Sequence, residues 1–163
     1  MEVLLIQKAK RHDKEAFSLL MHQHKQDMYK VARAILKNDE DVADAMQETI
    51  LTCWEKIHTL KKNEYFKTWL IRILINHCNV IYRQNSRCIP NDTLPEIVVA
   101  DAEYSNVEWK EMFQCLSERC RIVIVLYYVQ GFKVKEIAGF LHISESAVKE
   151  RLSSARKTIE RCL

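Results

Sequence analysis

The sequence predicts an all-α protein made of two small helical domains joined by a flexible acidic linker. The 163 residues include only two glycines and two prolines, and so few helix breakers disfavour a turn-rich β fold. Apolar residues recur at three- and four-residue spacing, which is typical of amphipathic helices. The charge is also unevenly distributed, because residues 89–115 hold six acidic residues and one lysine between two segments that are net basic.

The acidic stretch separates the two predicted domains. Both prolines fall in it, beside asparagine and aspartate residues that favour turns. We therefore expect domains at residues 1–86 and 105–163 and a linker at residues 87–104. A charged connector is usually only solvated, but two basic domains on one tether can also bind a single polyanion at two places and gain affinity.

Composition argues against several functional classes. The chain is 48% hydrophobic and 29% charged, as expected for a soluble globular protein. It has no run of about 18 apolar residues and no charge order typical of a secretory signal, so we expect a cytoplasmic protein. Because no glycine-rich phosphate loop, metal-spaced His/Cys set or Ser/His/Asp constellation is recognisable, we expect no cofactor, metal or small-molecule substrate. Cys53 and Cys78 lie on apolar helix faces, where buried, inert thiols are favoured over redox or metal roles.

Four helical patterns are visible in the first domain. They cover about residues 13–24, 27–37, 41–58 and 65–83, with a polar, lysine-bearing loop at 59–64 before the last. The residues expected to face the core are Ala16, Phe17, Leu19 and Leu20 in the first helix and Phe66, Trp69, Leu70, Ile73 and His77 in the fourth.

Two surfaces of this domain are candidates for binding. The third helix carries Asp44 and Glu48 on one face with Gln47 beside them; such a face is commonly solvated, and the alternative is a docking face for a basic partner. The loop and the fourth helix combine basic, amide and aromatic groups, which can hold a strand's phosphates and read splayed bases, although Phe66 and Trp69 also suit a core. The candidate contacts are Lys61, Lys62, Asn63, Lys67, Arg72, Asn76 and Arg83.

A helix-turn-helix is predicted in the second domain. An apolar helix over residues 116–130 ends at Gly131, a second runs over 132–141, and Ser144 caps a last helix after a short turn. In such motifs the start of the second helix lies in the DNA major groove. The predicted DNA contacts are Ser146, Lys149, Glu150, Arg151, Ser153, Ser154, Arg156 and Lys157.

These side chains suit different parts of a duplex. Lys149 can donate to guanine acceptors, and Glu150 can accept from a cytosine amine. Arg151, Arg156 and Lys157 suit phosphates, which position the helix and make binding salt-dependent. The alternative interpretation is a plain helical hairpin with solvated charges.

Three stretches of sequence carry a family resemblance. They are DVADAMQETILTCWEKI (residues 41–57), FKTWLIRILINHCNVIYR (66–83) and YYVQGFKVKEIAGFLHISESAVKERLSSARKTI (127–159). Together they make residues 12–162 resemble an extracytoplasmic-function (ECF) sigma factor of the sigma-70 family. The residues that match this family's pattern in the first domain are Asp44, Gln47, Glu48, Trp69, Leu70, Ile73, Asn76 and Arg83.

The resemblance implies an alternative sigma factor, not an enzyme, that binds core RNA polymerase, directs it to specific promoters and initiates transcription. Asp44, Gln47 and Glu48 would dock on the polymerase clamp helices, and residues 60–83 would melt and capture the non-template strand of the −10 element. The last helix would read the −35 element as duplex, although Glu150 stands where a small hydroxyl residue is common and leaves that base assignment open.

Further partners follow from the same resemblance. A membrane-anchored anti-sigma factor is implied, which would hold the factor at the inner face of the membrane, and the acidic linker would thread polymerase channels. The competing interpretation is a stand-alone helix-turn-helix regulator. That interpretation leaves the acidic helix and the aromatic, basic helix of the first domain without a task.

Overall fold

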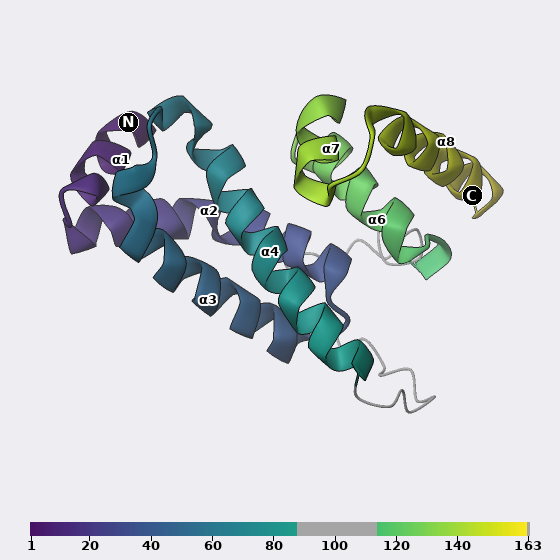
Figure 1. Ribbon diagram of the computed structural model, residues 1–163, viewed down its shortest axis with the longest axis horizontal. Helices are drawn as coiled ribbons and strands as arrows, with labels where there is room; N and C mark the ends of the chain where they lie inside the picture. The colour runs from purple at the N-terminus through teal and green to yellow at the C-terminus, as the bar shows by residue number, and fades with distance from the viewer. Residues whose placement is uncertain (88–113, 163) are drawn as a thin grey trace. The chain divides into compact units, whose positions relative to one another are not determined.

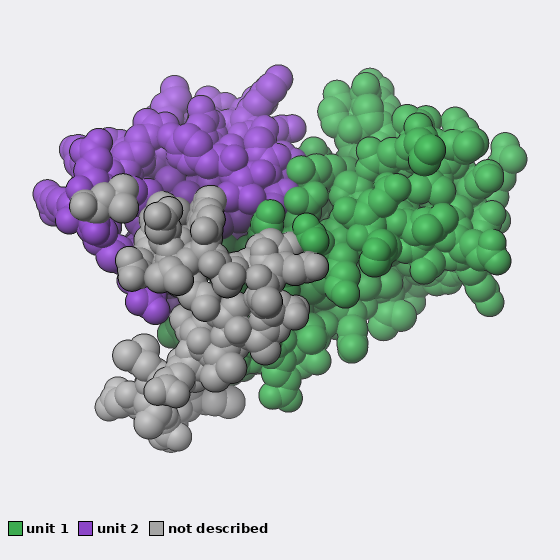
Figure 2. Space-filling model, turned by 180° about the vertical axis from the view of Figure 1, so that it is seen from behind, with its two compact units in different colours: residues 1–90 green, residues 91–163 purple. Residues whose placement is uncertain are grey.

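The computed structural model describes residues 1–87 and 114–162, and every regular element in these ranges is helical, as predicted. The chain divides into two compact units, residues 1–90 and 91–163 (Figure 2). The predicted linker, apart from Arg87, lies outside the described residues, so its bounds stay a prediction.

Unit 1 is a bundle of four helices in which α1 packs on α2, α3 lies along α4, and α2 contacts both α3 and α4 (Figure 1). Two short 3₁₀ turns, η1 and η2, make the connection between α3 and α4. The elements are α1 (Glu2–Lys10), α2 (Lys14–Ile35), α3 (Asp39–Lys56), η1 (Ile57–Thr59), η2 (Asn63–Tyr65) and α4 (Phe66–Arg87).

The prediction of two separate helices over residues 13–24 and 27–37 was wrong, because α2 is continuous. Lys25 and Gln26, where the break was placed, are good helix formers. The buried stripe also passes through the junction, since His24 is buried between the turns on either side. Because His24 is polar, it interrupts the apolar stripe of α2 in the sequence.

Helix α1 was not predicted, because its sequence pattern is weak. Only Ile6 and Ala9 of this helix are buried, so its apolar stripe is too narrow to recognise by periodicity. Asp13 then caps α2, because its Oδ1 accepts a hydrogen bond from the Ala16 N–H at 3.1 Å. Leu19, which was expected to face the core, is instead 57% exposed.

The core face of α4 also differs from the expected one. Phe66 and Leu70 are buried as predicted, but Trp69, Ile73 and His77 are only half-buried. The helix is apolar on more than one side, so the sequence pattern left its orientation ambiguous. The buried residues are Phe66, Leu70, Ile71, Leu74, Ile75 and Cys78.

One helix of unit 2 changes type along its length. The predicted helix over residues 116–130 is an α-helix, α6 (Glu118–Ile124), followed by a π-helical turn, η4 (Val125–Val129). It ends where predicted, at Gly131, whose φ of 75° lies in the left-handed region that favours glycine.

The helix-turn-helix consists of α7 (Val134–Leu141) and α8 (Glu145–Cys162). His142 makes the turn with a φ of 55°, and the Ser144 hydroxyl caps α8 by accepting from the Ala147 N–H at 3.1 Å. Phe140 is buried, whereas the neighbouring Leu141 is half-buried. The buried face of α8 is Val148, Leu152 and Ala155.

Candidate functional site

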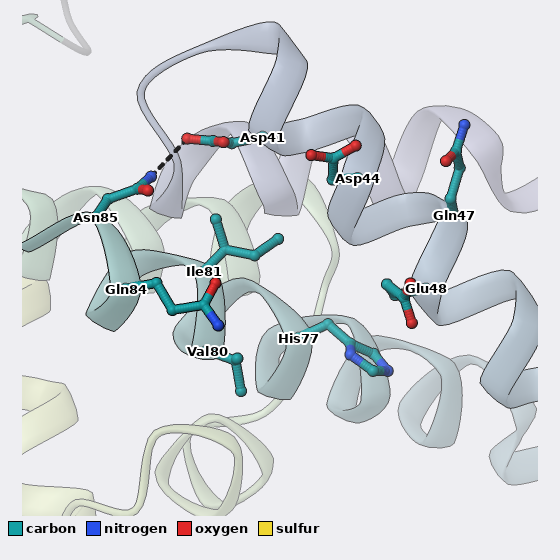
Figure 3. A pocket seen from close by; sticks show the side chains of 9 residues that line it. All are labelled: Asp41, Asp44, Gln47, Glu48, His77, Val80, Ile81, Gln84 and Asn85. Atoms are coloured by element: carbon teal, nitrogen blue, oxygen red, sulfur yellow. Dashed lines mark hydrogen bonds between the residues drawn. The ribbon is translucent and has the colours of Figure 1, made fainter. Parts of the chain in front are cut away.

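An acidic groove of about 440 Å³ lies between α3 and α4 (Figure 3). Asp44, Gln47 and Glu48, the predicted polymerase-docking residues, are all exposed and line its α3 side. The structure therefore brings these three together on one surface. The other lining residues are Asp41 on α3 and His77, Val80, Ile81, Gln84 and Asn85 on α4.

Hydrogen bonds tie the two walls of the groove together. Asn38 caps α3 by accepting from the Asp41 N–H at 2.8 Å, and the Asp41 carboxylate accepts from the Asn85 amide of α4 at 2.6 Å. Further along, Thr52 Oγ1 lies 2.9 Å from His77 Nε2. Because the Thr52 hydroxyl proton goes to a backbone carbonyl at 2.8 Å, Thr52 accepts here and His77 donates. These hydrogen bonds thus link α3 to α4 on the two sides of the groove.

The α4 wall was not predicted as part of the site. His77 was expected in the core, and Val80, Ile81, Gln84 and Asn85 were given no role. Their positions recur at three- and four-residue intervals, so the periodicity of one helix face was available as a signal. Val80 is 51% exposed, which shows that this second, partly apolar stripe does not belong to the core.

A second pocket, of about 410 Å³, lies where the loop after α3 meets the start of α4. It brings together Lys61, Lys62 and Arg72, three of the predicted strand contacts, around aromatic side chains. The Lys62 ammonium lies 5.9 Å from the centroid of the Tyr65 ring, which is within cation–π range. The lining residues are Leu60, Lys61, Lys62, Tyr65, Thr68, Trp69 and Arg72.

The structure separates the two aromatic residues whose roles were open. Phe66 is 1% exposed and belongs to the core, whereas Trp69 is half-buried and lines the pocket. Their ring centroids are 6.0 Å apart, so the buried Phe66 ring packs against Trp69. Tyr65 is an exposed pocket aromatic that sequence reasoning missed. Aromatic faces beside cations can stack bases while the cations hold phosphates.

Four predicted strand contacts lie outside the pocket. Asn63 Oδ1 accepts a hydrogen bond from Lys10 Nζ of α1 at 2.6 Å. Lys67 Nζ lies 3.9 Å from a carboxylate oxygen of Asp27 on α2. The remaining two, both exposed on α4 beyond the pocket, are Asn76 and Arg83.

The outer face of α8 carries the predicted duplex contacts. Arg151 is half-buried, and the others are exposed. Glu150 is exposed among them, so its negative charge is presented on the same helix as the basic residues. The exposed set is Ser146, Lys149, Glu150, Ser153, Ser154, Arg156 and Lys157.

Arg156 has a partner that was not predicted. Its Nε donates to the Tyr128 hydroxyl at 2.7 Å, and its guanidinium carbon lies 5.6 Å from the Tyr128 ring centroid. Tyr128 is 54% exposed, although Val125 and Leu126 of the same π-helical turn are buried. The sequence offered no sign of which of the adjacent Tyr127 and Tyr128 would turn outward.

The two cysteines predicted to be inert are fully buried and free. Burial raises the pKa of the Cys53 and Cys78 thiols to about 12, so neither is a thiolate near neutral pH. In the described part of the chain, no group of three or more His, Cys, Asp or Glu side chains could hold a metal ion. Within the same residues, no helix combines the length and apolar character needed to cross a membrane.

Comparison with known proteins places both units in one family. Residues 20–88 match Sigma-70 region 2, and residues 107–159 match Sigma-70, region 4. The RNA polymerase sigma factor SigV of Bacillus subtilis strain 168 is 28% identical over 153 residues, 92% of each chain. The ECF RNA polymerase sigma factor SigW of the same strain is 26% identical over 177 residues, 97% of this chain and 94% of the relative.

Solved structures share the fold. The sigma factor RpoE in complex with the anti-sigma factor NepR, from Bartonella quintana, has a TM-score of 0.73 at 20% identity and covers 90% of this chain and 95% of that one. CnrH in complex with the cytosolic domain of CnrY has a TM-score of 0.68 at 24% identity, over 98% and 95%.

The two helical units, one with an acidic groove and an aromatic, basic pocket and the other with a helix-turn-helix, are those of a sigma-type transcription initiation factor. The chain belongs to the sigma-70 family, in its ECF group. As such it binds core RNA polymerase and promoter DNA and is not an enzyme. The stand-alone regulator interpretation left the first unit without a function, whereas residues 20–88 of this unit match Sigma-70 region 2.

Proposed function

We propose that three separate surfaces of this sigma factor carry out polymerase docking, strand capture and duplex recognition. The acidic groove with Asp44, Gln47 and Glu48 binds the polymerase clamp helices. The pocket with Trp69 captures an unpaired base of the −10 element, and the outer face of α8 reads the −35 element. The chain acts in the cytoplasm.

The observation that carries this proposal is the composition of the pocket. Tyr65 and Trp69 offer ring faces, and the neighbouring Lys61, Lys62 and Arg72 offer positive charge for phosphates. A base that leaves the duplex loses its stacking, which costs a few kcal/mol, and stacking on a side chain offsets about 1–3 kcal/mol of that cost per base. A volume of about 410 Å³ has room for one unstacked base and its sugar.

The chain offers a matched pair of tryptophans to test this proposal. Trp69→Leu removes the pocket's ring, whereas Trp54→Leu removes a half-buried ring of α3 that packs on Phe17 with centroids 5.0 Å apart, away from the pocket. We expect Trp69→Leu to lower capture of a single-stranded −10 oligonucleotide by the polymerase complex about tenfold. Trp54→Leu should leave it unchanged. Equal losses in both variants would contradict the strand-capture role.

The sigma function as a whole is tested by runoff transcription. Purified core RNA polymerase is supplied with DNA from upstream of the gene, with and without the chain. We expect a transcript that depends on the chain. If the core enzyme neither binds the chain nor gains a start site, and the chain alone shifts duplex DNA, the stand-alone regulator interpretation replaces this one.

We also propose control by an anti-sigma factor anchored in the membrane, which holds this chain at the inner membrane face until it is released. The support is that the two solved structures described above are complexes, one with an anti-sigma factor and one with the cytosolic domain of CnrY. Co-expression with a candidate anti-sigma protein tests this, and we expect the partner to exclude core polymerase from the chain. A partner that binds without excluding polymerase would contradict it.

A further inference from the structure

Helix α1 lies wholly before residues 12–162, the range over which the family resemblance extends. It contacts α2 and both 3₁₀ turns, η1 and η2, that lead into the pocket. Sequence reasoning did not find it, and only two of its side chains are buried. Its packing therefore depends on specific polar contacts as well as on apolar area.

One of these contacts reaches the pocket loop directly. Lys10, at the end of α1, donates from Nζ to Asn63 Oδ1 at 2.6 Å, and both side chains are partly shielded from water. Asn63 stands immediately after Lys61 and Lys62, which line the pocket, and two residues before Tyr65. A charge-assisted hydrogen bond at this point fixes the loop against a helix 53 residues earlier in the chain.

A second contact fixes the other end of α1. Glu2 Oε1 lies 2.6 Å from His24 Nε2 of α2. The His24 ring lies against Phe66, with centroids 5.3 Å apart, and Phe66 supports Trp69 of the pocket. The two ends of α1 are thus connected to the loop side and to the α4 side of the same pocket.

We propose that α1 is a positioning element for the strand-capture pocket, and that Lys10 and Asn63 are positioning residues that hold its loop and do not read a base. The proposal rests on the strand-capture function given to the pocket above. It reassigns Asn63, which the sequence placed among the DNA contacts. The hydrogen bond from Lys10 directs the Asn63 side-chain oxygen toward α1.

The test uses the full chain with core polymerase, four variants of the Lys10–Asn63 pair and one control variant. Lys10→Met and Asn63→Leu each remove the hydrogen bond, the double variant removes both partners, and Asn63→Asp keeps an acceptor oxygen for Lys10. Lys8→Met is the matched control, because Lys8 is an exposed lysine of the same helix. Strand opening, base preference in the −10 element and core polymerase binding are measured for each, and the last reports on folding.

We expect each single variant to open the promoter about tenfold less well, and the double variant to be no worse than either single one, because both remove one interaction. Asn63→Asp should open the promoter as the native chain does, and base preference and core binding should not change. An aspartate in direct contact with DNA would instead repel the phosphates, so under the base-reading alternative Asn63→Asp is the most damaging variant.

Several outcomes would overturn this inference. The first is a changed base preference in Asn63→Leu while Lys10→Met behaves as the native chain does. The second is a loss of promoter opening in the double variant equal to the sum of the two single losses. The third is a loss of promoter opening as large in Lys8→Met as in Lys10→Met. These outcomes differ from a failure of the proposed function. In that case Trp69→Leu would capture the strand normally, whatever the α1 variants do.

Discussion

The groove and the pocket of unit 1 share α4 and have similar volumes, about 440 and 410 Å³, yet they have opposite chemistry. The groove presents carboxylates and amides, with Asp44 and Glu48 in its α3 wall. The pocket presents lysines, an arginine and aromatic rings. One helix can therefore serve a protein partner along one part and a nucleic acid along another, because its second wall is supplied by α3 in one case and by a loop in the other.

Charge reversal in the groove should have the largest effect. In Glu48→Arg we expect core polymerase affinity to fall about 100-fold, because a like charge opposes a basic partner and because truncating or opposing a paired interface charge costs about 2–5 kcal/mol. The measurement is a binding titration. Glu55→Arg, on an exposed acid of α3 outside the groove, is the control, and equal losses in both variants would show that the groove has no special role.

A change in the pocket should separate the two surfaces. We expect Arg72→Ala to lower promoter opening about tenfold through lost phosphate contact, while core polymerase binding stays at the native level. Permanganate reactivity of unpaired thymines measures opening. The control is Lys25→Ala, which changes an exposed lysine of α2 outside the pocket and should behave as the native chain does. If Arg72→Ala lowered core polymerase binding as well as promoter opening, the groove and the pocket would not be separate binding surfaces.

The Tyr128–Arg156 pair extends the comparison to unit 2, with a smaller expected effect. Arg156→Gln should reduce the salt dependence of duplex binding by about one unit of slope, as expected for one phosphate contact. Tyr128→Phe keeps the ring but removes the acceptor of the 2.7 Å hydrogen bond, so it should weaken binding about threefold. When Arg156→Gln is already present, Tyr128→Phe should not weaken duplex binding further. A further threefold loss of duplex binding in that double variant would contradict a role for the Tyr128–Arg156 pair.

The smallest effect near neutral pH is on the free energy of unfolding, and it comes from two buried thiols of α3 and α4. Cys53 of α3 and Cys78 of α4 have a pKa raised by burial from 9.0 to about 12. Above pH 9 the unfolded chain loses these protons while the folded chain keeps them, so stability falls between about pH 9 and 12 by roughly 1 kcal/mol per pH unit for each thiol. Denaturant titrations at pH 8 and 10 measure the fall. Cys78→Ala should reduce that slope, and an unchanged slope would contradict it.

How far the sequence predicted this molecule depended on how strongly each segment was patterned. Helix α3 has a polar face opposite an apolar one, and α8 has a serine cap and a spaced apolar face, so both were predicted closely. Helix α1 buries too little, and α4 is apolar on too many sides, so periodicity alone missed the first and misoriented the second. Helix α2 was divided because His24 interrupted its apolar stripe, although burial of that histidine shows that the stripe continues.

The candidate binding surfaces were also predicted only in part. The α3 side of the groove, with Asp44 and Glu48, was predicted from one helix face. Its α4 side was missed, because the pairing of two helices is a tertiary property. Lys10, Tyr65 and Tyr128 were missed for the same reason, since each acquires its place only through a partner far along the chain or through a turn in the backbone.

The continuity of α4 has one consequence for the geometry of initiation. An α-helix rises about 1.5 Å per residue, so Trp69 in the pocket and Ile81 in the groove are separated by about 18 Å along the axis. No hinge or glycine interrupts this stretch. The helix is therefore a rigid spacer. Under the roles proposed for the two surfaces, the number of residues between groove and pocket sets the register at which a strand would be held relative to the polymerase.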